Sequence, residues 1–169
     1  MPVYASDDQH DEGIDLDRWV RLAEGVLAAE GVSNDAELSL LFVDETTMAD
    51  LNQRFMGAPG PTDVLAFPID AGPETGPQPL SALEAHGSWL HAASQADAPP
   101  RLLGDVVICP AVAARQGQAH DASAELALLV VHGVLHVLGH DHAEPDEAAR
   151  MEIRQRQLLD QLYRPPELS

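Results

Sequence analysis

Residues 126–142 read LALLVVHGVLHVLGHDH, an apolar run that leads into four of the chain's eight histidines. The apolar part predicts a helix in the centre of a domain, because a solvated helix would carry a polar face. His132 and His136 are four residues apart and therefore project from the same face of that helix. Gly139 suits the left-handed turn that ends a helix, and such a turn directs His142 back toward the other two histidines.

Three neutral imidazoles with one open coordination position describe a catalytic zinc site, because a structural zinc site normally has four protein ligands. The alternative is a set of solvated histidines near a helix end, which the apolar segment before them disfavours. We therefore expect one zinc ion per chain, held by His132, His136 and His142 at the end of a central helix.

The spacing H-x-x-x-H-x-x-G-x-x-H is also the ligand pattern of the metzincin proteases. Those enzymes need a Glu directly after the first histidine, as the base that deprotonates the zinc-bound water. The corresponding residue here is Gly133, which has no side chain. A protease is therefore the secondary hypothesis, and another metal-assisted hydrolysis is favoured.

At 169 residues with 45% hydrophobic content, the chain predicts a single metallohydrolase domain over residues 1–169. Residues 70–100 are rich in Ala, Gly, Pro, Ser and Gln and have no sustained apolar period. They predict a flexible surface insertion in which His86 and His91 are solvent-exposed. Cys109, the single cysteine, excludes an internal disulfide and is expected to fill the core.

Charge and hydropathy restrict the partners of this protein. No charged-then-apolar leader opens the chain and no apolar run approaches membrane-spanning length, so a soluble cytoplasmic protein without a membrane partner is expected. The net charge is −19 and all nine basic residues are Arg. Because this charge repels nucleic acid, any RNA binding must depend on a local cleft.

The order of predicted elements is strand, helix, strand, helix, strand, long loop, strand and three helices. Strands are expected at 3–5, 37–43, 63–69 and 104–109, and helices at 15–30, after Asp44, Thr46 or Thr47, at 110–119, after Asp121, and from Pro145. This order predicts an α+β fold with a small mixed, mostly parallel four-stranded sheet packed with about five helices. The two strands that flank the long loop are candidates for antiparallel pairing.

Several separate segments resemble, in the same order, the bacterial YbeY endoribonucleases. Residues 132–142 match the family hallmark H-G-x-L-H-L-x-G-Y-D-H, with Val137 for the second Leu and His140 for the Tyr. Residues 61–68, PTDVLAFP, match the second hallmark P-T-D-V-L-S-F-P, and the GDVVI strand at 104–108 matches as well. The resemblance covers roughly residues 36–69 and 102–163 and keeps all three histidine ligand positions.

The resemblance implies a zinc-dependent, single-strand-specific endoribonuclease. Such an enzyme matures the 3′ end of the small-subunit (16S) ribosomal RNA and serves ribosome quality control. The implied zinc ligands are His132, His136 and His142. The implied partners are ribosomal RNA, the ribosome, a small-subunit ribosomal protein and the assembly GTPase Era.

One position departs from the family pattern. The family often has Arg just before the Gly that follows its Leu-Asn motif, and here Met56 occupies that position. Arg54 is the nearest substitute and is a candidate catalytic residue, but on a helix it points roughly 160 degrees away from position 56. Its alternative role is that of a solvated helix charge.

The general base is left open among three groups. A zinc ion lowers the pKa of bound water to about 7 and polarises a phosphoryl oxygen. The base is then the zinc hydroxide, a substrate phosphate or Asp141, and for Asp141 a role in orienting a histidine ligand is favoured. Thr62 and Asp63 are candidates to line the same cleft, although turn capping also explains both.

Two further classes of function remain open beside the endoribonuclease. A metallopeptidase-like hydrolase, or a hydrolase of another ester, would use the same three histidines. A non-enzymatic ribosome-assembly factor would use the metal only to stabilise the fold.

Overall fold

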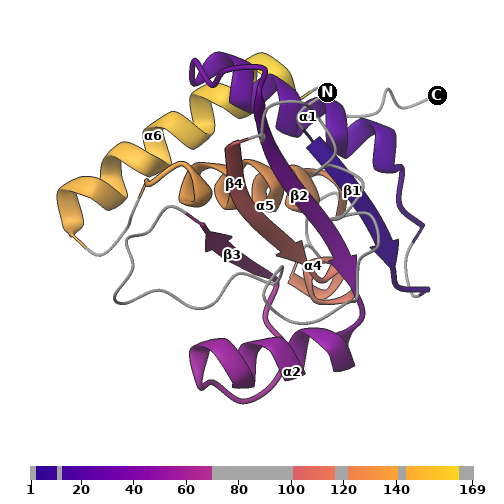
Figure 1. The fold of residues 1–169 in the computed structure, drawn as a ribbon. Helices are drawn as coiled ribbons and strands as arrows, with labels where there is room; N and C mark the ends of the chain where they lie inside the picture. Colours follow the sequence, from indigo (N-terminus) through magenta and orange to yellow (C-terminus); the bar gives the residue numbers. More distant parts are fainter. Residues whose placement is uncertain (1–2, 11–12, 70–100, 117–121, 141–143, 164–169) are drawn as a thin grey trace.

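A computed structural model describes residues 3–10, 13–69, 101–116, 122–140 and 144–163 (Figure 1). The strands are β1 (Val3–Asp8), β2 (Ala36–Val43), β3 (Val64–Pro68) and β4 (Arg101–Ile108). The helices are α1 (Leu16–Ala29), α2 (Glu45–Met56), α4 (Pro110–Gln116), α5 (Ala122–Val137) and α6 (Pro145–Leu162). The predicted order of elements and the α+β class are confirmed. The expected loop at 70–100, with His86 and His91, and the expected cap Asp121 lie outside the described residues.

The four strands form one sheet in the order β1-β2-β4-β3. β1 pairs with β2 and β2 with β4 in parallel, whereas β3 pairs with β4 in antiparallel orientation. The mostly parallel sheet and the antiparallel pairing across residues 70–100 are therefore as predicted. The prediction for the first strand was too short, because β1 pairs with β2 from Val3 to Asp8. The polar residues of its second half are tolerated because β1 is an edge strand.

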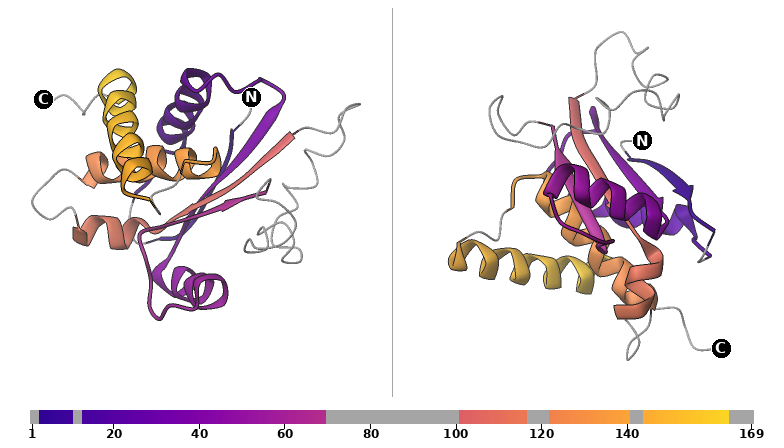
Figure 2. Two further views of the ribbon diagram at one scale, coloured as in Figure 1. Left: turned by 90° about the vertical axis from the view of Figure 1, so that its left-hand side faces the viewer. Right: turned by 90° about the horizontal axis from the view of Figure 1, so that it is seen from below.

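Alternate residues of β2 face two different cores, as the period of two in a strand requires. Leu40 and Phe42 belong to a large core with α1, α5 and α6. Val43 belongs to a second core, in which Met48 and Leu51 of α2 pack against the sheet. Figure 2 shows the consequence: α1, α5 and α6 lie on one side of the sheet and α2 on the other.

Helix ends follow the signals in the sequence. The side chain of Asp15 accepts a hydrogen bond from the backbone N–H of Arg18 at the start of α1, and Asp44 accepts one from Thr47 at the start of α2. Both are N-caps at predicted positions. Among the described residues, no helix is both long enough and apolar enough to cross a membrane.

Gly104 decides how closely β3 can approach β4. Its φ is +148°, in the region that favours glycine. A Cβ at this position would overlap the carbonyl oxygen of Phe67. The β2–β4 register also shifts next to this residue, between Glu37 and Leu38 of β2. Gly104 therefore allows the close antiparallel pairing that holds β3, the edge strand nearest the histidines.

Candidate metal centre

Helix α5 presents His132 and His136 side by side. Their ring centroids are 4.8 Å apart, with the rings edge to face at 70°. Both side chains are partly exposed, although the helix is otherwise largely buried. The predicted four-residue spacing thus brings the two imidazoles together at the surface end of a buried helix.

The two histidines line a pocket of about 320 Å³. Its walls come from α2, from β3 with the residue before it, and from α5, and its lining residues are Met56, Asp63, Val64, Leu65, Ala66, His132, Gly133 and His136. Part of the second hallmark segment, 61–68, therefore lies against the histidines of the first. The prediction that Asp63 lines the histidine cleft is confirmed, whereas Thr62 is not among these lining residues.

Gly133 lies against the sheet. A Cβ at this position would be 2.5 Å from Cγ1 of Val106 in β4, and Val106 is fully buried. Close packing of α5 on the sheet therefore requires glycine here. The Glu of a metzincin protease has no room at this position, which gives the missing base a structural reason.

Asp63 holds the start of β3 in place. Its Oδ1 accepts hydrogen bonds from the backbone N–H of Val64 at 2.8 Å and from the hydroxyl of Thr62 at 3.3 Å. Its backbone carbonyl accepts from the N–H of Cys109 at 2.9 Å. The carboxylate thus serves both as a turn cap and as an acidic wall of the pocket, so both predicted roles apply to it.

Met56 and Arg54 are placed very differently. Met56 lines the pocket and is 48% exposed. The Arg54 side chain is 61% exposed and pairs with Asp50 at 3.1 Å, one helical turn earlier. Among the described lining residues there is no Arg, and Arg54 lies outside them. A catalytic role for Arg54 stays a prediction, without support from this geometry.

Sequence reasoning missed a polar contact behind the first histidine. Nδ1 of His132 lies 2.9 Å from Oε1 of Gln155 in α6. The spacing of Met151, Gln155 and Leu158 could have indicated this contact, because it puts them on one face of α6. Met151 and Leu158 are buried on that face. A polar side chain within such an apolar face needs a hydrogen-bond partner.

The end of α5 is closed by the predicted glycine turn. Gly139 has a φ of +101°, and its N–H donates to the carbonyl of His136 at 3.0 Å. The N–H of His140 donates to the carbonyl of Leu135 at 3.0 Å. These two bonds form a Schellman motif, the common way in which a helix ends at glycine. The turn predicted at Gly139 is confirmed.

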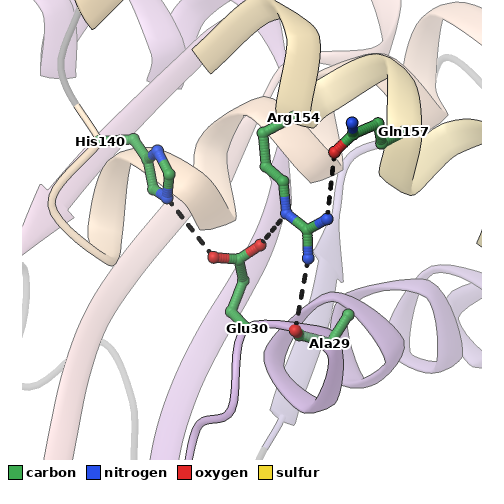
Figure 3. Close-up of polar contacts among 5 residues, drawn as sticks. All are labelled: Ala29, Glu30, His140, Arg154 and Gln157. Atoms are coloured by element: carbon green, nitrogen blue, oxygen red, sulfur yellow. Dashed lines mark hydrogen bonds and ion pairs between the residues drawn. The ribbon is translucent and has the colours of Figure 1, made fainter. Parts of the chain in front are cut away.

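The side chain after that turn is held by α1 and α6 (Figure 3). Nε2 of His140 lies 3.5 Å from a carboxylate oxygen of Glu30, at the end of α1. The other oxygen of Glu30 pairs with Arg154 of α6 at 2.5 Å. Arg154 also donates to the carbonyl of Ala29 at 3.3 Å, one of the carbonyls that a helix end leaves open. The end of α1, which is distant in sequence, therefore meets α6 where the chain leaves α5.

Zinc was predicted on three histidines, of which the structure describes two. His142 and the candidate Asp141 lie outside the described residues, within which no group of three or more His, Cys, Asp or Glu side chains is arranged so that it could hold a metal ion. Imidazole nitrogens are favoured zinc donors, and a pocket beside them leaves space for water and substrate. His132 and His136 are therefore suitable zinc donors, and the pocket beside them suits a catalytic site.

Comparison with known proteins places the chain in a family. The family model described as Endoribonuclease YbeY matches residues 4–163. This chain belongs to the endoribonuclease YbeY family. Endoribonuclease YbeY of Salinispora tropica is 49% identical over 148 residues, covering 86% of this chain and 87% of that protein. Endoribonuclease YbeY of Mycobacterium tuberculosis is 43% identical over 159 residues, covering 90% and 80%.

A solved structure shares the fold of this chain. The solution structure of TM1509 from Thermotoga maritima matches with a TM-score of 0.57 and 21% identity. The match covers 95% of this chain and 89% of that protein. The YbeY family model also spans every residue of the histidine pocket, so the resemblance stated from the two hallmark segments is confirmed.

Proposed function

We propose that this chain is a zinc-dependent endoribonuclease that cleaves single-stranded RNA. The observation that carries the proposal is the pair His132 and His136 in one pocket with Asp63 and Val64, in a chain of the YbeY family. The proposed role is maturation of the 3′ end of 16S ribosomal RNA and ribosome quality control. This role rests on the family.

His132, His136 and His142 would hold one zinc ion. When bound, zinc supplies a polarised water and a positive charge for a phosphoryl oxygen. The protein contributes rigidity, because α5 is packed in the core and cannot move its histidines independently of the sheet. Asp141 is proposed to orient a histidine ligand.

RNA binding by this chain should be weak and local. The described pocket lining contains an acidic residue, Asp63, and no Arg, in a chain of net charge −19. We expect a shallow salt dependence, equivalent to roughly one to three phosphate contacts. Productive capture of RNA is therefore proposed to depend on the ribosome, through a small-subunit ribosomal protein and the assembly GTPase Era.

A ribosome-assembly factor without catalytic activity is the second candidate. The absence of Arg from the described pocket lining favours it, because phosphodiester hydrolysis gains from a cation beside the phosphate. A metallopeptidase of the metzincin type is disfavoured, since the close packing of Gly133 on Val106 leaves no space for the required Glu.

The test is cleavage of a single-stranded ribosomal RNA fragment, with and without ribosomal particles. Wild type loaded with zinc should cleave, and His132→Ala and metal-stripped wild type should not. His10→Ala is the matched control, because His10 is exposed and outside the pocket lining. Equal activity of wild type and His132→Ala would indicate a contaminating nuclease. Inactive wild type, even with ribosomal particles, would support the assembly-factor role.

A further inference from the structure

Gln155 is the polar member of a buried helix face. It follows Met151 by four residues and precedes Leu158 by three, and those two side chains are 3% and 0% exposed in the main core. This spacing turns Gln155 toward α5 and away from solvent. The side chain is partly buried, where a hydrogen bond within the protein replaces one to water.

The hydrogen-bond partner of Gln155 is the Nδ1 atom of the His132 imidazole. The 2.9 Å contact joins Oε1 of Gln155 to Nδ1 of His132, while the same imidazole lines the histidine pocket. A carbonyl oxygen only accepts, so Nδ1 must carry the proton in this arrangement. Nε2 is then the nitrogen with a lone pair. A neutral histidine with its lone pair on Nε2 is ready to bind a metal through that atom.

We propose that Gln155 is a positioning residue that holds His132 in the Nδ1–H tautomer and fixes the ring for zinc binding. This inference rests on the proposed zinc site. Metal-binding histidines commonly donate their second N–H to a carbonyl or carboxylate, which sets the ring orientation. Here the acceptor comes from α6, a separate element that is itself anchored in the core by Leu158.

A neutral acceptor suits this protein. A carboxylate behind His132 would add negative charge beside a pocket that already contains Asp63, in a chain of net charge −19. Such a charge would repel an RNA phosphate. Gln155 supplies the same hydrogen-bond geometry without the charge. Gln155→Glu should therefore keep zinc binding while weakening RNA cleavage.

The experiment measures tautomer and zinc affinity separately. In metal-free protein, long-range ¹H–¹⁵N correlation spectra should show His132 protonated on Nδ1 in wild type. In Gln155→Met, which keeps the chain length but removes the acceptor, that preference should be lost. Zinc affinity of Gln155→Met, measured by competition with a chelator, should fall about 10–100-fold. Gln155→Glu should retain wild-type affinity or exceed it.

Gln161→Met is the matched control, because Gln161 is exposed on the same helix. It should leave the tautomer and zinc affinity unchanged. Wild-type protein with His132 protonated on Nε2, or Gln155→Met with unchanged zinc affinity, would overturn the role of Gln155 alone. Wild type that binds no zinc would overturn both the zinc site and this role. An unexpected tautomer of His132 in protein that still binds zinc would overturn only the role of Gln155.

Discussion

At the scale of single residues, Gly133 separates this chain from a protease. The position follows the first histidine directly, and a Cβ there would be 2.5 Å from Val106. The same glycine lets α5 lie close to β4, so the two histidines sit at the edge of the sheet beside β3. One missing side chain therefore affects both the chemistry and the packing of the pocket.

Gly133→Ala should lower the free energy of unfolding by about 1–3 kcal/mol, the usual cost of overpacking a core. The higher helix propensity of Ala, worth about 1 kcal/mol, opposes this but does not exceed it. Chemical denaturation measures the change. The cost should shrink in a Val106→Ala background, which provides space.

Gly25→Ala in α1 is the control for the Gly133 experiment. A Cβ there would lie 3.2 Å from Cδ2 of Leu162, the far end of a flexible side chain. A small effect is expected. If Gly133→Ala were as mild as Gly25→Ala, or equally costly with and without Val106→Ala, the packing explanation would be wrong.

The thiol of Cys109 should be inert in the folded protein. The residue is fully buried in the second core, and burial raises the pKa of its thiol, which keeps it protonated and unreactive. A soluble thiol reagent at neutral pH should modify native protein no faster than the protein unfolds. Denatured protein should react at once. Fast labelling under native conditions would contradict the predicted role as core filler.

At the scale of elements, helix caps follow the sequence closely. Asp44 precedes α2, and Gly57, with a φ of +66°, ends it. Gly31 and Gly139 end α1 and α5 with positive φ as well. These ends are local: Asp44 accepts a hydrogen bond from a backbone N–H three residues on, and the glycines form backbone hydrogen bonds with the preceding turn. For this reason they can be predicted without the fold.

The Asp44 cap of α2 should make the unfolding free energy of the protein depend on pH. Hydrogen bonds from Thr47 lower the pKa of the Asp44 carboxyl below its ordinary value. A lowered folded-state pKa stabilises the fold above the unfolded-state pKa of about 3.9. That stabilisation is lost as pH falls further, through the folded-state pKa.

Asp44→Asn isolates this charge, because Asn caps a helix about as well as Asp. Wild type should exceed Asp44→Asn by about 0.3–1 kcal/mol in unfolding free energy at neutral pH. The difference should shrink as pH falls below about 3.9 and vanish once the carboxyl is protonated in the folded state as well. Urea denaturation of both proteins across this range measures it. A difference that stays constant with pH would show that the charge of Asp44 does not stabilise α2.

At the scale of the whole molecule, β3 and β4 form a hairpin whose two strands are joined by residues 70–100. Pro68 pairs with Gly104, and the N–H of Ile69 donates to the carbonyl of Leu103 at 3.1 Å. The open ends of the two strands are therefore adjacent, and a short link can join them. The composition of 70–100 supplies no periodic apolar face that the core would lose.

Trimming of residues 70–100 to a short Gly-Ser link should leave the melting temperature within a few degrees of wild type. A shorter loop also costs less closure entropy, which offsets small losses. Thermal unfolding followed by circular dichroism measures this. A chain that no longer folds would show that the segment contains a packed element.

Much of the architecture was predictable because its signals are local. Alternating and uniformly apolar segments predicted the four strands, and caps and glycines predicted the helix ends. The first strand was underestimated, since Ser6, Asp7 and Asp8 are paired only because β2 lies beside them. The contact of Gln155 with His132 was missed for the same reason: residues far apart in sequence meet only after the helices pack.

The sequence by itself determined the α+β class, the helix that carries the histidines and the family of the chain. Each depends on patterns within short segments and on the order of those segments along the chain, because hydrophobic period and backbone hydrogen bonding act over a few residues. Only the tertiary structure decided what surrounds those histidines. It placed Met56 and Asp63 in the pocket, left Arg54 outside the described lining, and put Gln155 behind His132. Such neighbours depend on how helices and strands pack across the whole core. No local pattern in the chain specifies which residues from different elements come into contact.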